Sequence, residues 1–153
     1  MNIKIDRLPN YRIAYLRQVG PYGPHNVKVM EKLKSWAKKK GLFNKNSIIL
    51  SIPRDNPEVT SPENCRYDAA IVISNEYKID NSVSEDRLIG GQYGVYRVKH
   101  TAEEIKKAWD LIFVELLNEG YLVDSRPTFE RYYGEEDDID YCDICIPIIL
   151  KQQ

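Results

Sequence analysis

The sequence has no long apolar run, no signal sequence and almost no net charge. No stretch approaches the roughly 20 apolar residues that a helix needs to cross a bilayer, so no membrane association is expected. The 22 basic and 23 acidic residues leave a net charge of −1, which gives the chain as a whole no electrostatic attraction to nucleic acid. The first residues, MNIKID, show no charged segment leading into an apolar one and predict no signal peptide.

Cysteine and histidine are also scarce. The three cysteines, Cys65, Cys142 and Cys145, are an odd number, which favours a reducing cytoplasm over a disulfide-bonded secreted domain. Cys142 and Cys145 have the spacing of half a zinc site, but residues three apart on a strand point to opposite faces, and no second Cys or His pair follows. No Ser or Cys lies beside His25 or His100 as an activated nucleophile. We therefore expect no metal, no disulfide, no other cofactor and no catalytic residue of this kind.

The composition is otherwise that of one globular domain spanning residues 1–153. Hydrophobic residues make up 42% of the chain and charged residues 29%, both ordinary values for such a domain. Eleven tyrosines stand against three phenylalanines and two tryptophans. Tyrosine can line a cavity and still form a hydrogen bond, so the aromatic content is compatible with a binding pocket.

The first half of the chain predicts one helix between strands. Residues 11–19 are rich in β-branched and aromatic side chains and indicate a strand. Val27, Met30, Leu33 and Ala37 then form an apolar stripe at helical spacing. Gly41 is suited to end this helix. Residues 47–53 and 67–74 predict two further strands.

The second half predicts the same order. A strand begins at Gly90-Gly91, and Thr101 to Glu104 has the pattern of a capping box that starts a helix. Ile105, Ala108, Trp109, Ile112, Phe113 and Leu116 supply its apolar stripe. Residues 128–133 and 141–150 predict strands, joined by an acidic turn at 135–140.

The fold class is therefore α+β, with two repeated strand-helix-strand-strand modules at approximately 3–80 and 88–150 and antiparallel strands. The segments 68–73 and 143–148 share a start at Asp and an apolar continuation, which supports the repeat. A three-stranded unit with one helix buries too little surface to be stable alone, so the modules are expected to pack together. The groove between them is the natural place for a ligand.

Glu130 is the leading candidate for a binding residue. On a strand, Thr128, Glu130 and Tyr132 share one face, whereas Phe129 and Arg131 point the other way. If Phe129 faces the helices, Glu130 and Tyr132 face the opposite surface. A carboxylate walled by aromatic rings favours a positively charged, apolar ligand. The plainer alternative is a solvated glutamate paired with a nearby arginine, and spacing alone favours that alternative.

Other aromatic residues are weaker candidates for the same groove. Tyr93 and Tyr96 lie on opposite faces of their strand, so at most one of them can reach it. Tyr67 and Tyr11 are further candidates, although half-buried sheet tyrosines are common. Trp109 lies on the apolar stripe of the second helix, where a core position is favoured and the edge of a cavity is also compatible.

Five stretches together resemble the GyrI-like family, the small-molecule-binding domain also fused to the DNA-binding modules of AraC-type and MerR-type regulators and found alone as DNA gyrase inhibitory protein. The resemblance extends from about residue 3 to residue 150. The stretches are Gln18-Val19-Gly20-Pro21-Tyr22, Asp55-Asn56-Pro57, Gly90-Gly91-Gln92-Tyr93, Trp109 and Pro127-Thr128-Phe129-Glu130-Arg131-Tyr132.

The resemblance implies a twofold-repeated α+β domain whose strands line a hydrophobic groove. It implies that Glu130 faces lipophilic cations, with Tyr132, Tyr93 and Trp109 in the same cavity, and it reverses the preference for a solvated Glu130. The function implied is a cytoplasmic, free-standing module that binds amphipathic or cationic small molecules, with a role in drug sequestration or DNA gyrase inhibition. The alternative is a hydrolase in which the pocket glutamate acts on an electrophilic small molecule.

Overall fold

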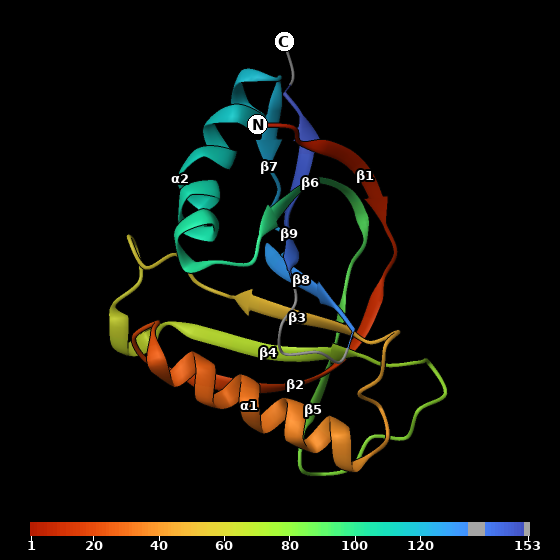
Figure 1. The fold of residues 1–153 in the computed structure, drawn as a ribbon. Coiled ribbons are helices and arrows are strands. Elements are labelled where there is room, and N and C mark those ends of the chain that lie inside the picture. Colours follow the sequence, from red (N-terminus) through yellow and green to blue (C-terminus); the bar gives the residue numbers. More distant parts are fainter. Residues whose placement is uncertain (135–139, 152–153) are drawn as a thin grey trace.

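The computed structural model describes residues 1–134 and 140–151. Two helices lie on the same side of a curled sheet (Figure 1). The elements, in chain order, are β1 (Lys4–Leu8), β2 (Tyr11–Val19), α1 (Pro24–Lys39), β3 (Ile48–Pro53), a 3₁₀ turn (Pro62–Asn64), β4 (Arg66–Val72), β5 (Ser84–Leu88), β6 (Gly91–Lys99), α2 (Ala102–Asn118), β7 (Tyr121–Val123), β8 (Phe129–Tyr133) and β9 (Tyr141–Leu150). The predicted acidic turn at 135–140 lies outside the described residues except for Asp140.

The strand order is symmetric about the contact between β8 and β3. The path across the sheet is β1-β6-β9-β8-β3-β4-β2-β5, with β7 paired to β9 beside this path. All of these pairings are antiparallel. The predicted α+β class and the order β2-α1-β3-β4 and β6-α2-β8-β9 are confirmed, with β7 added in the second half. The two strand sets join through β3 and β8.

The edges of the sheet are formed by strands that the sequence reasoning missed. β1 pairs with β6 of the second half, and β5 pairs with β2 of the first half. Each is five residues long and exposes most of its side chains, so that only Leu88 of β5 is buried. Short, charged strands are typical of sheet edges, and they lack the apolar alternation that identifies a strand. Each half therefore supplies an edge strand to the other.

Helix α1 packs on β2 and β4, but its buried stripe differs from the predicted one. Leu33 and Ala37 are buried as expected, together with Val29 and Trp36. Val27 is 60% exposed, and Met30 is only partly buried. The helix is rotated so that Met30 turns toward the space between the helices. It ends as predicted, with Gly41 at a φ of 70°.

Helix α2 starts at the predicted N-cap and covers the second half of the sheet. The Thr101 hydroxyl oxygen accepts a hydrogen bond from the backbone N–H of Glu104 at 3.2 Å. Ala108, Ile112 and Leu116 are buried against the sheet. Within the described residues, neither helix is long and apolar enough to span a membrane.

The faces of the sheet decide where the candidate site lies. On the side turned away from the helices, Phe129 packs in a cluster with Tyr11, Tyr93 and Leu50. Phe129 therefore does not face the helices, and the expectation built on that orientation is wrong: Glu130 lies on the helix-facing side of β8. Because β8 and β3 meet between α1 and α2, their helix-facing side chains form the floor of a groove.

The three cysteines are buried and free. Cys142 belongs to the cluster beneath α2, and Cys145 belongs to the cluster on the opposite side of the sheet. This is the opposite-face placement that strand alternation predicts for residues three apart.

Candidate functional site: a cavity between the two helices

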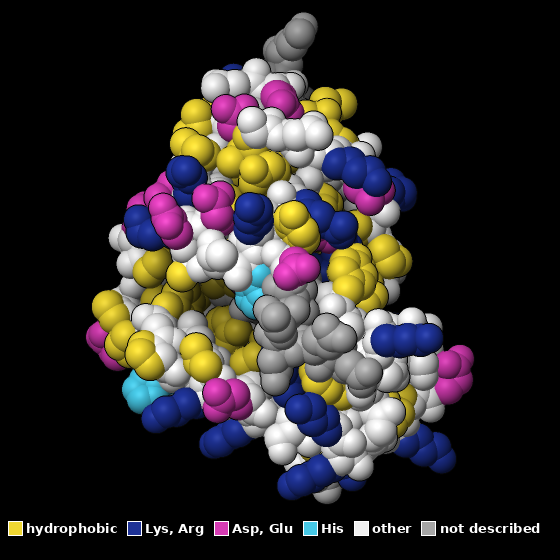
Figure 2. Space-filling model, viewed as in Figure 1, with side chains coloured by type: hydrophobic (Ala, Val, Ile, Leu, Met, Phe, Trp, Pro, Cys, Tyr) yellow, Lys and Arg dark blue, Asp and Glu magenta, His cyan; other side chains and the backbone are white. Residues whose placement is uncertain are grey.

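A cavity of about 560 Å³ lies between α1 and α2, over β3 and β8. The space-filling view shows a hollow lined mainly by hydrophobic side chains at this place (Figure 2). Its volume lies within the roughly 300–1,000 Å³ of small-molecule sites. The lining residues are Asn26, Val27, Met30, Glu31, Lys34, Phe43, Ile49, Ser51, Pro53, Tyr67, His100, Trp109, Glu130, Tyr132 and Gly134.

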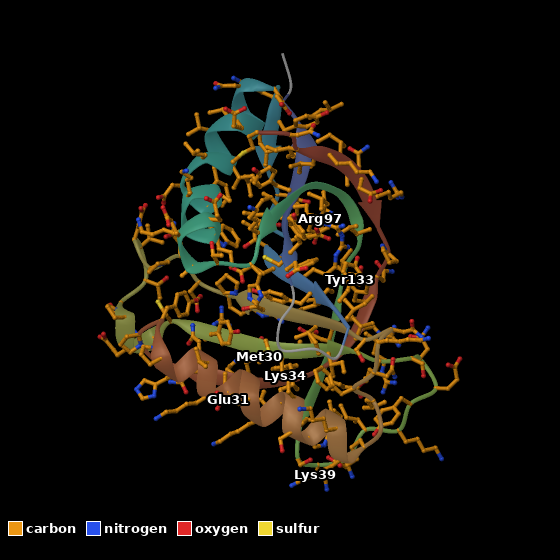
Figure 3. All side chains as sticks on the ribbon, in the orientation of Figure 1. Met30, Glu31, Lys34, Lys39, Arg97 and Tyr133 are labelled. Atoms are coloured by element: carbon orange, nitrogen blue, oxygen red, sulfur yellow. The ribbon has the colours of Figure 1, made fainter. Side chains whose placement is uncertain are left out.

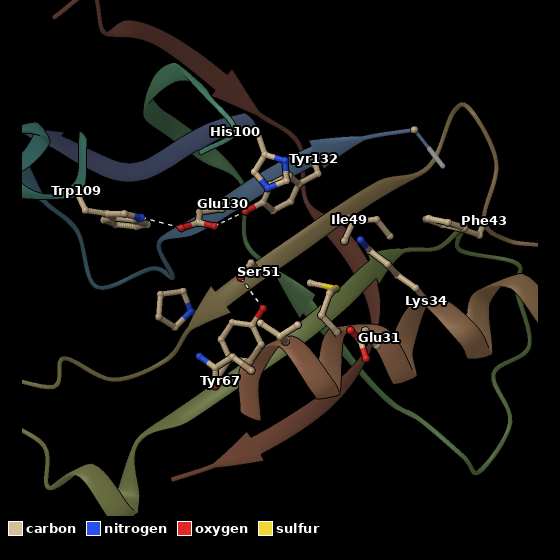
Figure 4. A pocket seen from close by; sticks show the side chains of 15 residues that line it. Glu31, Lys34, Phe43, Ile49, Ser51, Tyr67, His100, Trp109, Glu130 and Tyr132 are labelled. Atoms are coloured by element: carbon tan, nitrogen blue, oxygen red, sulfur yellow. Dashed lines mark hydrogen bonds between the residues drawn. The ribbon is translucent and has the colours of Figure 1, made fainter. Parts of the chain in front are cut away.

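The carboxylate of Glu130 lies between an indole and a phenol (Figure 4). Trp109 of α2 donates from Nε1 to Glu130 Oε1 at 2.8 Å. The hydroxyl of Tyr132, two residues along β8, donates a short hydrogen bond to Oε2. Each carboxylate oxygen thus has one neutral donor, and the two bonds hold the group in one orientation.

Glu130 forms no ion pair within 4.0 Å among residues 1–134 and 140–151, although Glu31 and Lys34 line the same cavity. No ion pair between described residues includes its carboxylate. Hydrogen bonds from Trp109 and Tyr132 stabilise the carboxylate but leave its charge in place. The cavity therefore contains a half-buried negative charge held by neutral groups.

Two other carboxylates in the sheet show the contrasting arrangement. Asp68 and Asp143 are fully or almost fully buried, and each is held by two arginines. Here the fold supplies the counter-charge itself, as buried carboxylates usually require. The ion pairs are Arg17–Asp68 and Arg54–Asp68, both 2.7 Å, Arg97–Asp143 at 3.0 Å and Arg131–Asp143 at 2.9 Å.

The tyrosine hydroxyls of the cavity remain protonated over the physiological range. Burial and the negative charge of Glu130 raise the pKa of Tyr132 far above its usual value. Burial, with a smaller contribution from the charge of Glu130, raises the pKa of Tyr67 to about 12. The Tyr67 hydroxyl lies 2.6 Å from the hydroxyl of Ser51, and Ser51 is the register partner of Glu130 across β3 and β8. The Tyr132 hydroxyl therefore donates to the carboxylate in its protonated form, and the Tyr67 hydroxyl is also protonated.

Aromatic and apolar side chains form most of the remaining wall, with a few polar or charged ones from α1 and β3. The ring of His100 lies 5.0 Å from that of Tyr132, measured between centroids. Trp109 packs beside Phe113 at 6.1 Å. Met30 comes from the middle of α1, together with Glu31 and Lys34 (Figure 3). Aromatic faces attract cations through their ring quadrupoles, so the wall can complement a positive charge as well as an apolar body.

The structure brings together four of the six residues singled out from the sequence. Glu130, Tyr132, Trp109 and Tyr67 all line the cavity.

Tyr93 and Tyr11 do not line it, and their expected place in the groove is wrong. Both lie on the other side of the sheet, where Tyr93 donates to the carbonyl of Pro127 at 3.2 Å and the hydroxyl of Tyr11 accepts from Arg131 at 3.2 Å. The reason is alternation: their side chains share the face of Phe129.

Other lining residues were missed because no local pattern marks them. Ser51, Met30 and Phe43 come from three separate segments of the first half. His100 precedes α2 and also lines the cavity, although its sequence neighbours indicate no site. The position of Ser51 beside Glu130 follows from the pairing of β3 with β8, and no pattern in the sequence predicts that register.

Comparisons with known proteins cover nearly the whole chain. A family model described as the GyrI-like small molecule binding domain matches residues 1–149. YosT, an SPbeta prophage-derived protein of Bacillus subtilis (strain 168), is 38% identical over 149 residues, which is 97% of this chain and 99% of YosT. The DNA gyrase inhibitor of Escherichia coli (strain K12) is 28% identical over 148 residues, 94% of this chain and 93% of the inhibitor.

A solved structure shows the same fold. SAV2435 bound to tetraphenylphosphonium matches with a TM-score of 0.63 and 15% identity, over 97% of this chain and 94% of that chain.

Proposed function

This chain belongs to the GyrI-like family of small-molecule-binding domains, and from that premise we propose that it binds lipophilic cations in the cavity between α1 and α2. The observation that carries the proposal is the set of partners that the Glu130 carboxylate has. Its carboxylate is fixed by Trp109 and Tyr132 and has no positive partner in the described part of the chain. A bound cation would supply the counter-charge that the arginines supply at Asp68 and Asp143.

The surroundings of Glu130 explain why the cation should be lipophilic. A small hydrated ion would lose its water in a cavity walled by Met30, Phe43, Ile49 and Trp109, and that loss is costly. An aromatic cation is weakly hydrated, gains contact with the apolar wall and attracts the ring faces. The tetraphenylphosphonium held by SAV2435, a protein of the same fold, supports this choice of ligand class.

Calorimetric titration of tetraphenylphosphonium into the wild type and Glu130→Gln tests the proposal. Gln keeps the shape of the side chain but removes its charge. We expect a loss of about 1–3 kcal/mol, the range for a contact to a charged group, or a rise in Kd of roughly five- to 150-fold. Glu103→Gln is the matched control, since Glu103 is exposed on α2 and does not line the cavity. Equal Kd values for the wild type and both variants would contradict the proposal.

We also propose that the domain acts on DNA gyrase. Its similarity to the E. coli DNA gyrase inhibitor extends over 94% of this chain, which supports a shared activity of the whole domain and not of one motif. In a supercoiling assay, we expect the purified protein to reduce the activity of gyrase in proportion to its concentration. Tetraphenylphosphonium added to the same reaction shows whether ligand binding modulates the effect. Unchanged supercoiling at a large molar excess of the protein would refute this role.

A further inference from the structure

The outer face of α2 is unusually apolar for a surface that no other element of residues 1–134 and 140–151 covers. Leu111 is 49% exposed, Val114 57% and Leu117 49%. In Figure 1 this side of α2 points away from the sheet, and Figure 2 shows hydrophobic side chains among charged ones over it. A helix that also buries Ala108, Ile112 and Leu116 beneath it is apolar on both sides, a pattern typical of helices that are covered on both sides.

Helix α1 provides an internal comparison. It occupies the equivalent place in the first half, where it packs on β2 and β4, whereas α2 packs on β6 and β7. Its outer face is polar, with exposed Lys28, Lys32, Lys38 and Lys39. The fold therefore does not require apolar residues on the outer face of such a helix. The exposed apolar residues of α2 indicate that something else covers that face.

The charges of α2 are arranged in a way that suits a second copy of the same helix. Lys107, Leu111 and Glu115 follow one another at four-residue spacing along one edge. No ion pair among the described residues includes Lys107 or Glu115, whereas the neighbouring Lys106 pairs with Asp110. The last turn of α2 carries no basic residue. The edge thus runs from a positive charge through an apolar residue to a negative charge.

We propose that α2 pairs antiparallel with α2 of a second copy about a twofold axis between Leu111 and Val114. Leu111 of each chain then lies opposite Val114 of the other, since a twofold interface repeats each contact twice. Lys107 of one copy comes beside the last turn of the other, which carries Glu115 and is followed by Glu119 at the C-cap. The antiparallel arrangement also places each helix N-terminus near the C-terminus of its partner, where the helix dipoles attract.

Sedimentation velocity over a range of concentrations tests the pairing. We expect the wild type to form a dimer and Val114→Asp to remain monomeric with an unchanged circular dichroism spectrum. Ile89→Asp is the matched control, since Ile89 is 66% exposed in the connection between β5 and β6, and it should dimerise like the wild type. A wild type that stays monomeric at every concentration, or a control that dissociates to the same extent as Val114→Asp, would overturn the proposal.

A charge exchange separates self-pairing from binding of a different protein. Lys107→Glu and Glu115→Lys should each weaken dimerisation by about tenfold, because each places like charges together at both ends of the interface. The double variant should recover most of the wild-type affinity, since the opposite charges meet again with their signs reversed. If the double variant is as weak as the single variants, the antiparallel register is wrong.

Discussion

At the level of single residues, the cavity depends on how one carboxylate is stabilised. Glu130 accepts hydrogen bonds from Trp109 and Tyr132, whereas the two buried aspartates of the sheet are held by arginines. Neutral donors orient a carboxylate without removing its electrostatic field, which remains available to a ligand. The difference between these carboxylates is what distinguishes a binding site from a structural ion pair.

The hydrogen bond from Tyr132 gives a prediction about stability. Tyr132→Phe removes only the hydroxyl and leaves one oxygen of Glu130 without its donor, so we expect the free energy of unfolding to fall by about 1.5–3 kcal/mol. Denaturant unfolding measures this change. Tyr133→Phe is the control on the adjacent residue, whose ring is 44% exposed and stays in contact with Arg131; its effect should be close to zero. Similar losses of unfolding free energy in both variants would show that the hydrogen bond from Tyr132 to Glu130 contributes no specific stabilisation.

Part of this site could be predicted from the sequence. Alternation along β8 predicted the shared face of Glu130 and Tyr132. It could not decide which face that was, because Phe129 is equally suited to pack under a helix or inside the curl of the sheet. For the same reason Tyr93 and Tyr11 were assigned to the groove, although both pack with Phe129 on the other side.

At the level of elements, the helices and long strands were predictable and the edge strands were not. Strand β2, the N-cap at Thr101 and the turn at Gly41 follow from local patterns that the structure confirms. Strands β1 and β5 carry charged, exposed side chains, and they are defined by pairing with the opposite half of the chain. Partners so distant in sequence leave no local pattern.

The two helices have similar positions in the two halves but differ in the residues on their exposed faces. Both bury one stripe against the sheet, but α1 exposes lysines where α2 exposes Leu111, Val114 and Leu117. Phe113 belongs to the apolar stripe that the helical spacing predicts for α2, but it is 40% exposed in the structure. An apolar residue on a helix signals a covered face, but the sequence does not say whether the cover is the sheet or another molecule.

At the level of the whole molecule, the two halves form one sheet because β1 pairs with β6, β5 pairs with β2, and β3 pairs with β8. Helices α1 and α2 then lie on either side of the contact between β3 and β8. The cavity exists only because both halves contribute: Trp109, Glu130 and Tyr132 come from the second, and Met30 and Ser51 from the first. That residues 1–153 form a single domain with an internal repeat at approximately 3–80 and 88–150 stays a prediction. The hydrolase alternative also stays a prediction. Conversion of an electrophilic ligand into a product would favour it, whereas saturable binding without a product would favour the binding module.

The most direct test of the central claim compares two ligands of the same shape and opposite charge. Tetraphenylphosphonium and tetraphenylborate differ mainly in sign, so the ratio of their Kd values isolates the effect of the cavity's charge. The account predicts that the wild type prefers the phosphonium, and that Glu130→Gln weakens phosphonium binding while strengthening borate binding. A wild type that binds both ions equally, or a ratio that Glu130→Gln leaves unchanged, would contradict the claim that Glu130 is the charge anchor of the site.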